Sequence, residues 1–180
     1  LYMNCLYKLN RGYGFNGNTT AFIEMEDGIN EHGLAVGLTF IYPKIIKAGF
    51  NSGMLVRYLL EKCKTTSEVI ESLNMIPIAS QQTLSVIDNA GNFAVMECNC
   101  SHIEIIKPAG HNCFIVATNS FVSQKMAEYN NHAIDNWHSD ERYSVAYNVL
   151  KENRNHFSVG LARDILSGKH GFMCQYKRNK

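Results

Sequence analysis

The chain has 180 residues, a length typical of one domain, and its 46% hydrophobic and 18% charged residues are ordinary for a globular protein. Its formal net charge of +1 provides no field to attract nucleic acid or an acidic membrane, and no apolar run approaches the roughly 20 residues of a membrane span. The first residues lack the basic start of a signal peptide, and a core-rich chain with six cysteines needs no disulfide framework. We therefore expect a cytoplasmic protein that binds neither nucleic acid nor membrane.

The first part of the chain predicts an irregular segment followed by a strand. Residues 11–18 are rich in Gly and Asn, a composition typical of turns and loops. Apolar and polar residues then alternate over 20–25, as in a half-buried strand. We expect the first regular element of the chain there.

Two glycines and a polar cluster next predict a tight turn that leads into a buried strand. Gly28 and Gly33 bracket an Asn-Glu-His cluster, and glycine reaches the positive φ that such turns require. Residues 34–42 are apolar apart from Gly37 and Thr39, which is typical of a strand buried on both faces. Because Gly37 has no side chain, a ligand or another backbone can approach the strand there. This strand can form the floor of a site.

Capping signals and periodicity predict the remaining elements. Asn51 or Ser52 caps one helix, and the capping box at 65–68 opens another, which Pro77 ends. Strands are expected at 82–88, 93–98, 102–107 and 113–118, and helices at 123–129, 140–151 and 158–166. This segregation of strands from helices favours an α+β fold with an antiparallel sheet over a βαβ alternation.

Asn119 is the first candidate for chemistry outside the glycine-rich strand. It follows the apolar run of the strand expected at 113–118, where that strand gives way to a helix. A side-chain amide at a strand end can aim its NH2 group at a developing oxyanion. The alternative is that Asn119 or Ser120 caps the helix that follows.

Arg142 is the second candidate. Ser139 or Asp140 is expected to cap a helix there, with acidic residues in its favourable first turn. A cation near a helix N-terminus opposes the helix dipole, so Arg142 should have a partner or a task. The alternative is a surface ion pair with Asp140 or Glu141.

A Cys/His set supports a different class of site, a metal centre. Cys98, Cys100 and His102 would share one side of a strand, and a neighbouring strand could bring His111 and Cys113 close. The spacing lacks the Cys-x2-Cys form of common zinc sites, and such residues around a hairpin also serve packing and surface roles. We therefore expect no bound metal, and the metal-binding domain stays an alternative. His32 is interpreted as a solvated turn residue.

The sequence resembles a known family of enzymes over most of its length. The run Asn-Glu-His-Gly-Leu-Ala-Val-Gly-Leu-Thr-Phe at 30–40 is similar to a strand of the choloylglycine-hydrolase and penicillin-acylase families, closest to the acyl-coenzyme A:6-aminopenicillanic acid acyltransferase-like branch. Thr-Asn at 118–119 and Glu-Arg-Tyr at 141–143 resemble two further motifs of these N-terminal-nucleophile amide hydrolases, in the same order. Segments at 51–61, 77–80 and 95–99 also resemble the branch.

The resemblance implies a fold and a set of roles. The fold would be an αββα four-layer sandwich, and the activity cleavage of the C–N bond of linear acyl amides by a Cys nucleophile. Asn119 would stabilise the oxyanion, Arg142 would lie beside the thiolate, and Gly37 and Thr39 would line the acyl pocket. The enzymes need no cofactor, their partner is a small acyl amide, and relatives often form homo-oligomers.

The sequence also departs from the family pattern. The nucleophile Cys and the Gly-Arg-Asn-x-Asp motif that follows it are both missing, and residue 1 is Leu. Cys5 lacks that motif, so packing is the better interpretation of it. Thr39 stands where bile-salt hydrolases have an Asn that contributes to the oxyanion hole.

From these departures we expect 1–180 to be a single domain, incomplete at both ends and inactive alone, within a longer hydrolase or acyltransferase. The alternative is a truncated or non-catalytic module that binds acyl amides without cleaving them. A reading frame with a Cys and the missing motif before Leu1 would favour the enzyme.

Overall fold

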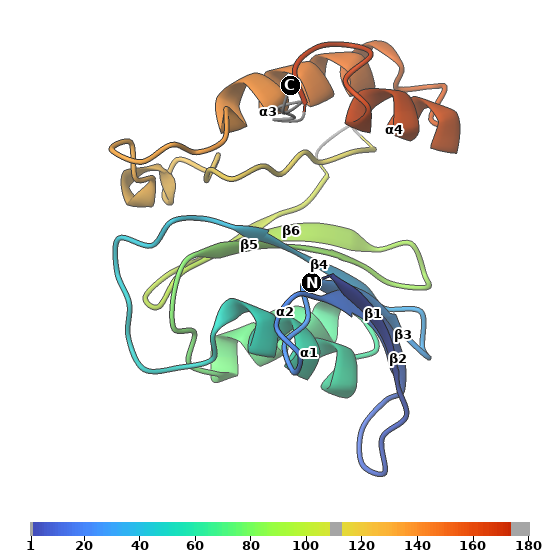
Figure 1. The fold of residues 1–180 in the computed structure, drawn as a ribbon, viewed down its shortest axis with the longest axis vertical. Helices are drawn as coiled ribbons and strands as arrows, with labels where there is room; N and C mark the ends of the chain where they lie inside the picture. The colour runs from blue at the N-terminus through green and yellow to red at the C-terminus, as the bar shows by residue number, and fades with distance from the viewer. Residues whose placement is uncertain (1, 109–112, 174–180) are drawn as a thin grey trace, which may run out of the picture.

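The fold is a single antiparallel sheet with helices on both sides (Figure 1). The computed structural model describes residues 2–108 and 113–173. The seven strands lie side by side in chain order: β1 (Met3–Tyr7), β2 (Phe15–Thr19), β3 (Asp27–Asn30), β4 (Ala35–Phe40), β5 (Gln82–Ile87), β6 (Phe93–Cys98) and β7 (Ile103–Ile106). The helices are α1 (Ser52–Lys62), α2 (Thr66–Met75), the 3-10 turn η1 (Ala127–Tyr129), α3 (Ser139–Glu152) and α4 (Val159–Leu166). No described helix is long and apolar enough to cross a membrane.

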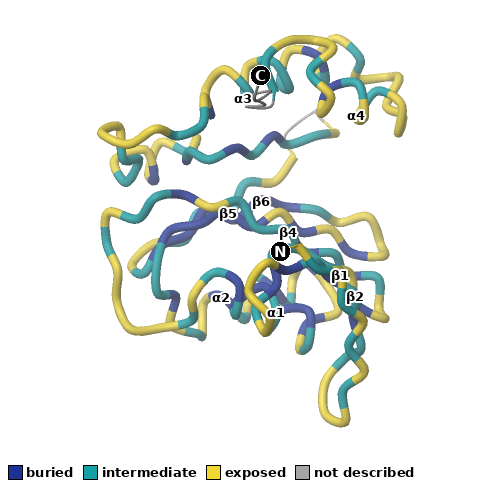
Figure 2. Tube along the Cα trace, in the orientation of Figure 1, coloured by how far each residue is buried: buried dark blue, intermediate teal, exposed yellow. Residues whose placement is uncertain are grey.

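The main hydrophobic core lies between the sheet and the α1–α2 pair. Helix α1 packs on β3 and β4 through a face that includes Leu55, Leu59 and Leu60, all fully buried. Strand residues Val36 and Leu84 meet this face from the sheet. Figure 2 shows that this half of the molecule contains most of the buried residues. Burial of these side chains is the main source of stability for the sheet.

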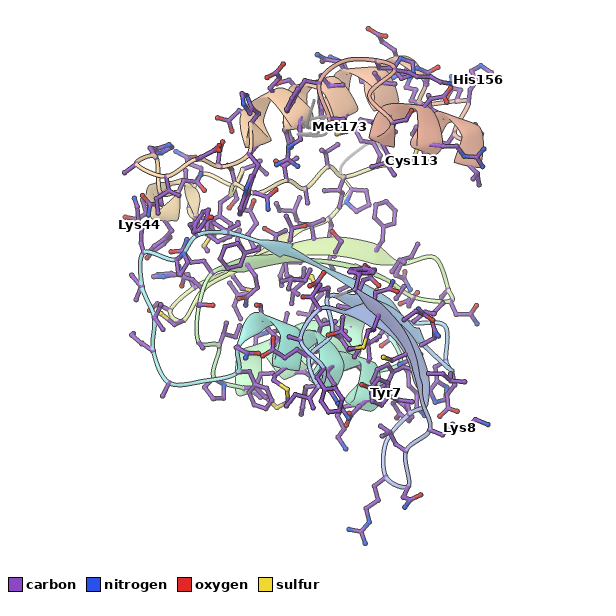
Figure 3. The ribbon with its side chains drawn as sticks, viewed as in Figure 1. Tyr7, Lys8, Lys44, Cys113, His156 and Met173 are labelled. Carbon is purple, nitrogen blue, oxygen red and sulfur yellow. The ribbon has the colours of Figure 1, made fainter. Side chains whose placement is uncertain are left out.

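The opposite face of the sheet is covered differently. From residue 113 the chain runs as an extended segment over this face and then forms α3 and α4, which make an outer layer (Figure 1). A small apolar cluster of Ile41, Phe121 and Met126 joins this segment to the end of β4. Lys44, labelled in Figure 3, adds a polar link because its Nζ donates to Glu128 O at 2.8 Å.

The strand register determines which residues face this second side. Gly37 lies opposite Asp27 on β3 and Ser85 on β5, and Ser85 lies opposite Val95 on β6. Since neighbouring residues of a strand point to opposite faces, these four share the face that is turned away from α1 and α2. The expected α+β fold with an antiparallel sheet is confirmed.

The capping predictions for α1 and α2 are also confirmed. The side chain of Asn51 accepts from Met54 N at 2.8 Å and caps α1. Thr65 Oγ1 accepts from Glu68 N at 3.2 Å, and the carboxylate of Glu68 accepts from Lys64 N at 2.6 Å. The hairpin of β5 and β6 forms across the predicted turn.

The prediction of a strand at 20–25 is wrong. The strand is β2, inside the Gly- and Asn-rich segment, while Phe22 has a left-handed φ of 51° in the turn that follows. The alternation was misleading because Phe22 is 77% exposed. The polar β2 is held in the sheet because Asn4 on β1 donates to the side chains of Asn16 and Asn18. Glycine is required at position 17 because a Cβ there would lie 2.6 Å from Asp27 O.

Two later predictions are also wrong. Residues 113–118 form no strand ladder, apart from an isolated bridge of Thr118 with Ser120, and 123–129 contains only the short turn η1. The apolar pattern of this segment reflects its position between the sheet and α3, where side chains rather than a neighbouring strand hold it. In addition, the second face of β4 is half-buried, since Ala35, Gly37 and Thr39 are all partly exposed.

Asp88 predicts a pH dependence of stability. Its buried carboxylate accepts from Thr66 N at 3.0 Å, at the start of α2, and from Ala90 N and Asn92 N at 3.0 Å in the β5–β6 turn. Burial raises the pKa of Asp88, but the hydrogen bonds from Thr66 and Asn92 outweigh it and the net pKa is lowered. A lowered pKa in the folded state stabilises the fold above the unfolded-state pKa of about 3.9, and this stabilisation is lost as pH falls through the folded value.

We therefore expect Asp88→Asn to lower the free energy of unfolding by about 1–3 kcal/mol at pH 7 and by less at each step below about pH 4. Urea denaturation at a series of pH values measures this difference. The exposed Asp140→Asn is the control. If the loss of unfolding free energy in Asp88→Asn does not change with pH, ionisation of Asp88 does not stabilise the fold.

Candidate active site

Three separate parts of the chain meet at the side chain of Asn119. Asn119 Nδ2 donates to Phe40 O, at the end of β4, at 2.7 Å. Arg142 Nη2, from the first turn of α3, donates to Asn119 Oδ1 at 2.7 Å. The structure thus joins Asn119 and Arg142 directly and links both to the last residue of the glycine-rich strand.

These two bonds orient the Asn119 amide. A guanidinium is a donor only, so the amide atom that faces Arg142 must be the oxygen. The NH2 group therefore points toward β4. It has two hydrogens, and Phe40 O accepts one of them, so the second has no acceptor among the described residues.

Arg142 also organises the start of α3. Its Nε donates to Trp137 O at 2.8 Å, and Nη2 lies 3.5 Å from Asn136 O. Trp137 and His138 have left-handed φ values of 55° and 53°, which is strained for residues other than glycine. The guanidinium therefore bonds the backbone of a strained turn as well as the amide of Asn119.

The expected cap of α3 is wrong in position. The cap residue is His138, without a side-chain cap bond, and Ser139 lies inside the helix. The buried Ser139 Oγ instead donates to Thr118 Oγ1 at 2.7 Å, next to Asn119. Glu141 lies 3.3 Å from His138 Nδ1. Thus α3 holds the Asn119 segment through both Ser139 and Arg142.

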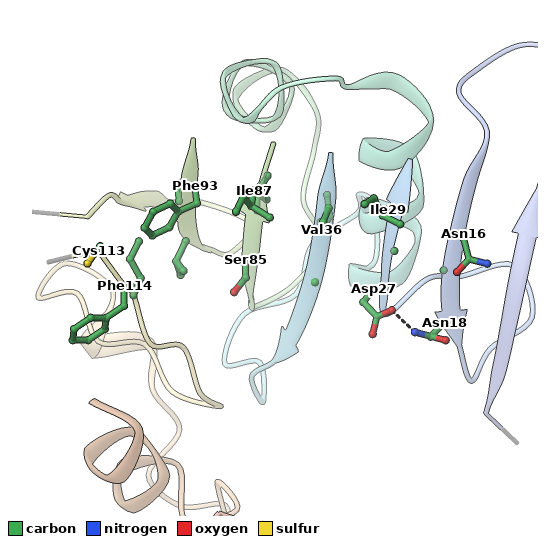
Figure 4. A pocket seen from close by; sticks show the side chains of 18 residues that line it. Asn16, Asn18, Asp27, Ile29, Val36, Ser85, Ile87, Phe93, Cys113 and Phe114 are labelled. Carbon is green, nitrogen blue, oxygen red and sulfur yellow. Dashed lines mark hydrogen bonds between the residues drawn. The ribbon is translucent and has the colours of Figure 1, made fainter. Parts of the chain in front are cut away.

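A cavity of about 660 Å³ lies over the second face of the sheet. Figure 4 shows its aromatic end, at Phe93 and Phe114, and its polar end, where Asn18 Nδ2 donates to Asp27 Oδ1 at 2.6 Å. The volume is within the range of small-molecule sites, which is about 300–1,000 Å³. The cavity could hold a ligand with an extended apolar part.

Gly37 and Thr39 have different relations to this cavity. Gly37 lines it, and a Cβ built on Gly37 would have nothing within 4 Å, so the open space reaches the backbone of β4. Thr39 is on the same face two residues further, opposite Thr83, and is outside the residues that line the cavity. Thr39 lies between Gly37 and Phe40, and so between the cavity and the carbonyl that holds Asn119.

Partly exposed aromatic rings lie at the Asn119 end of β4. Trp137 stacks on Tyr42 with ring centroids 5.0 Å apart and lies 6.3 Å from the ring of Phe40. All three rings flank the segment that bonds Asn119. They give the region an apolar wall, which composition alone did not indicate.

The cysteines and histidines do not form a metal centre in the described part of the chain, where no group of three or more potential ligands occurs. Burial raises the pKa of Cys98 to about 12, and its Sγ lies 3.2 Å from Gln82 Nε2 on the helix-covered side of the sheet. His102 Nδ1 is 2.9 Å from Tyr129 Oη, and Cys113 lies below α4 in Figure 3. His111 lies outside the described residues.

Several solved structures resemble this one, and a search of curated proteins found no match. Penicillin V acylase from Agrobacterium tumefaciens has a TM-score of 0.60 at 19% identity, over 89% of this chain and 56% of that chain. The Caenorhabditis elegans ortholog of N-acylethanolamine-hydrolyzing acid amidase has a TM-score of 0.61 at 18% identity, over 92% and 73%. A mutant of conjugated bile acid hydrolase from Clostridium perfringens has a TM-score of 0.59 at 14% identity, over 92% and 69%.

The TM-scores establish the fold, and the N-terminal-nucleophile hydrolase type of fold expected from the sequence is confirmed. The chain spans just over half of the penicillin V acylase and about two thirds or more of the other two. Its described residues form one sheet, with the extended segment between that sheet and the outer helices. The sequence model of one family, acyl-coenzyme A:6-aminopenicillanic acid acyl-transferase, matches residues 1–180. The chain therefore belongs to the acyl-coenzyme A:6-aminopenicillanic acid acyl-transferase family.

Proposed function

We propose that the chain is part of an N-terminal-nucleophile enzyme that cleaves the C–N bond of a linear acyl amide. Membership of the family and the fold of the related hydrolases support this class. The observation that carries the proposal is the Asn119 amide, which Phe40 O and Arg142 hold with one hydrogen left to donate.

In this reaction a Cys thiolate from outside the 180 residues attacks the carbonyl carbon of the amide. The carbonyl oxygen becomes an oxyanion, and Asn119 Nδ2 donates a hydrogen bond to it. The α-amino group of the nucleophile accepts the thiol proton and passes it to the leaving amine as the C–N bond breaks. The acyl-enzyme then transfers its acyl group to water or to an amine.

Arg142 has two roles in the proposal. Its guanidinium fixes the amide of Asn119 before the substrate binds, so the donor needs no reorganisation when negative charge develops. Its positive charge also favours the thiolate over the thiol in the complete enzyme. The 2.7 Å bond between Arg142 and Asn119 supports the first role directly.

The cavity is the proposed acyl pocket. Its aliphatic and aromatic lining at Ile87, Phe93, Phe114 and Ile115 suits an apolar acyl group, and Gly37 leaves space at the backbone. Asp27 and Asn18 could bond a polar group of the substrate. Thr39 would lie between the pocket and the reacting carbonyl, with its hydroxyl available to the substrate.

A non-catalytic module that binds acyl amides is the second candidate. It is favoured by Cys63 and Cys98, whose pKa values burial raises, so neither is a thiolate at neutral pH. A panel of acyl amides tested with the full-length protein separates the two. Release of amine and acid, or acyl transfer, supports the enzyme, whereas binding without turnover supports the module.

We predict that Asn119→Ala in the full-length enzyme lowers kcat by about 10²–10³, because one oxyanion donor is lost. KM should change little, since the bond strengthens only in the transition state. Steady-state kinetics measure both. Asn148→Ala, at an exposed position of α3, is the control. Near-normal turnover of Asn119→Ala would remove Asn119 from the mechanism.

We also predict separate effects for two substitutions of Arg142. Arg142→Gln should lower the free energy of unfolding by about 1–3 kcal/mol, because charged hydrogen bonds to Asn119 and Trp137 are lost. Arg142→Lys keeps the charge but not the planar fork, so kcat should fall while the thiolate remains stabilised. Urea denaturation and kinetics measure the two effects, with the exposed Arg163→Gln as control. If Arg142→Lys behaves like the wild type, the orientation of Asn119 does not depend on the guanidinium.

A further inference from the structure

Residues 118–123 are held in place by polar side chains from several distant elements. None of these residues belongs to a strand of the sheet, yet each has such a partner. Three side chains donate to side chains of the segment: Ser139 Oγ to Thr118 Oγ1 (2.7 Å), Arg142 Nη2 to Asn119 Oδ1 (2.7 Å) and Asn136 Nδ2 to Ser120 Oγ (3.1 Å). Asn130 accepts from Phe121 N (2.8 Å) and donates to Phe121 O (2.9 Å). The carboxylate of Glu97 accepts from Val122 N (2.5 Å) and Ser123 N (3.1 Å).

Glu97 is the charged anchor of this segment. It lies on β6, on the face turned away from α1 and α2, and it is 1% exposed. Besides the two backbone N–H groups, it accepts from Ser123 Oγ at 2.5 Å. Burial of a carboxylate is costly unless several donors satisfy it, so these three bonds form a built site that determines the position of residues 122 and 123.

The other end of the segment is tied to β4. Asn119 bonds Phe40 O there, while Glu97 holds Val122 on β6, with β5 between the two strands. The segment therefore passes from β4 over β5 to β6, bends at Asn119 and is held at both ends. Because two residues separate Asn119 from Val122, displacement of Val122 would also displace Asn119.

The charge of Glu97 also reaches the helix that carries Arg142. The pKa of Tyr143 on α3 is raised, mainly by burial and then by Tyr147 and the charge of Glu97. Glu97 lies in the same row across the sheet as Thr83 and Thr39. Glu97 thus lies in the row of Thr39, two strands away, without contacting Asn119 itself.

We propose that Glu97 is a positioning residue for the oxyanion donor. Its carboxylate fixes the far end of the extended segment and so places the amide of Asn119 against β4. This inference rests on the proposed function, because it assigns Glu97 a role through Asn119. A glutamine at this position has one oxygen to accept, and its NH2 group would face a backbone N–H donor.

The test is a double-mutant cycle in the full-length enzyme with Glu97→Gln, Asn119→Ala and the double variant. We expect Glu97→Gln alone to lower kcat about tenfold or more, with KM within about twofold. In the Asn119→Ala background the same change should cost less than about twofold, because the group that Glu97 positions is already absent. Glu104→Gln is the matched control: Glu104 lies directly opposite on β7, is more exposed and pairs with Lys125.

The outcomes separate this inference from the proposed function. An equal cost of Glu97→Gln in both backgrounds would show a purely structural role and overturn the inference. Near-normal turnover of Asn119→Ala would remove Asn119 from the mechanism and overturn the inference, whereas binding of acyl amides without turnover by the full-length protein would overturn the proposed function. If Glu97→Gln fails to fold, Ser123→Ala removes one donor to the carboxylate and should shift the side-chain amide NMR signals of Asn119. Unchanged Asn119 signals in that variant would also overturn the inference.

Discussion

The candidate site depends on one side chain that is bonded at both of its ends. Asn119 donates to the last carbonyl of β4 and accepts from Arg142, so it connects the sheet to the outer helix layer. Because a guanidinium cannot accept, the amide has one orientation. Removal of either partner would free the amide to rotate. A single residue of an irregular segment thereby acquires the fixed geometry that electrostatic stabilisation requires.

The sheet can hold this geometry because its two faces differ: helices pack one face, and the other contains the cavity. One face is packed by α1 and α2 around fully buried residues such as Leu59 and Leu84, and this packing stabilises the strands. The other face keeps a cavity that reaches the backbone at Gly37. A rigid, one-sided core allows the second face to remain partly open without loss of the fold.

Local signals predicted much of this arrangement, and long-range contacts account for the rest. The caps at Asn51 and Thr65 were predicted because they depend on residues three or four apart. The strand β2 was not, since Asn16 and Asn18 are stabilised by Asn4 rather than by an apolar pattern. Residue types and order indicated Asn119 and Arg142, but only the structure shows that they bond.

Glu97 shows why such a residue escapes sequence reasoning. In the strand pattern of β6 it resembles an ordinary polar residue on the solvent side, and its neighbour across the ladder, Glu104, is indeed partly exposed. The difference arises from residues 122 and 123, which return over the sheet and donate three hydrogen bonds to one carboxylate. A buried charge can be tolerated only where such donors converge. Its burial is therefore itself a sign that the position of the returning segment matters.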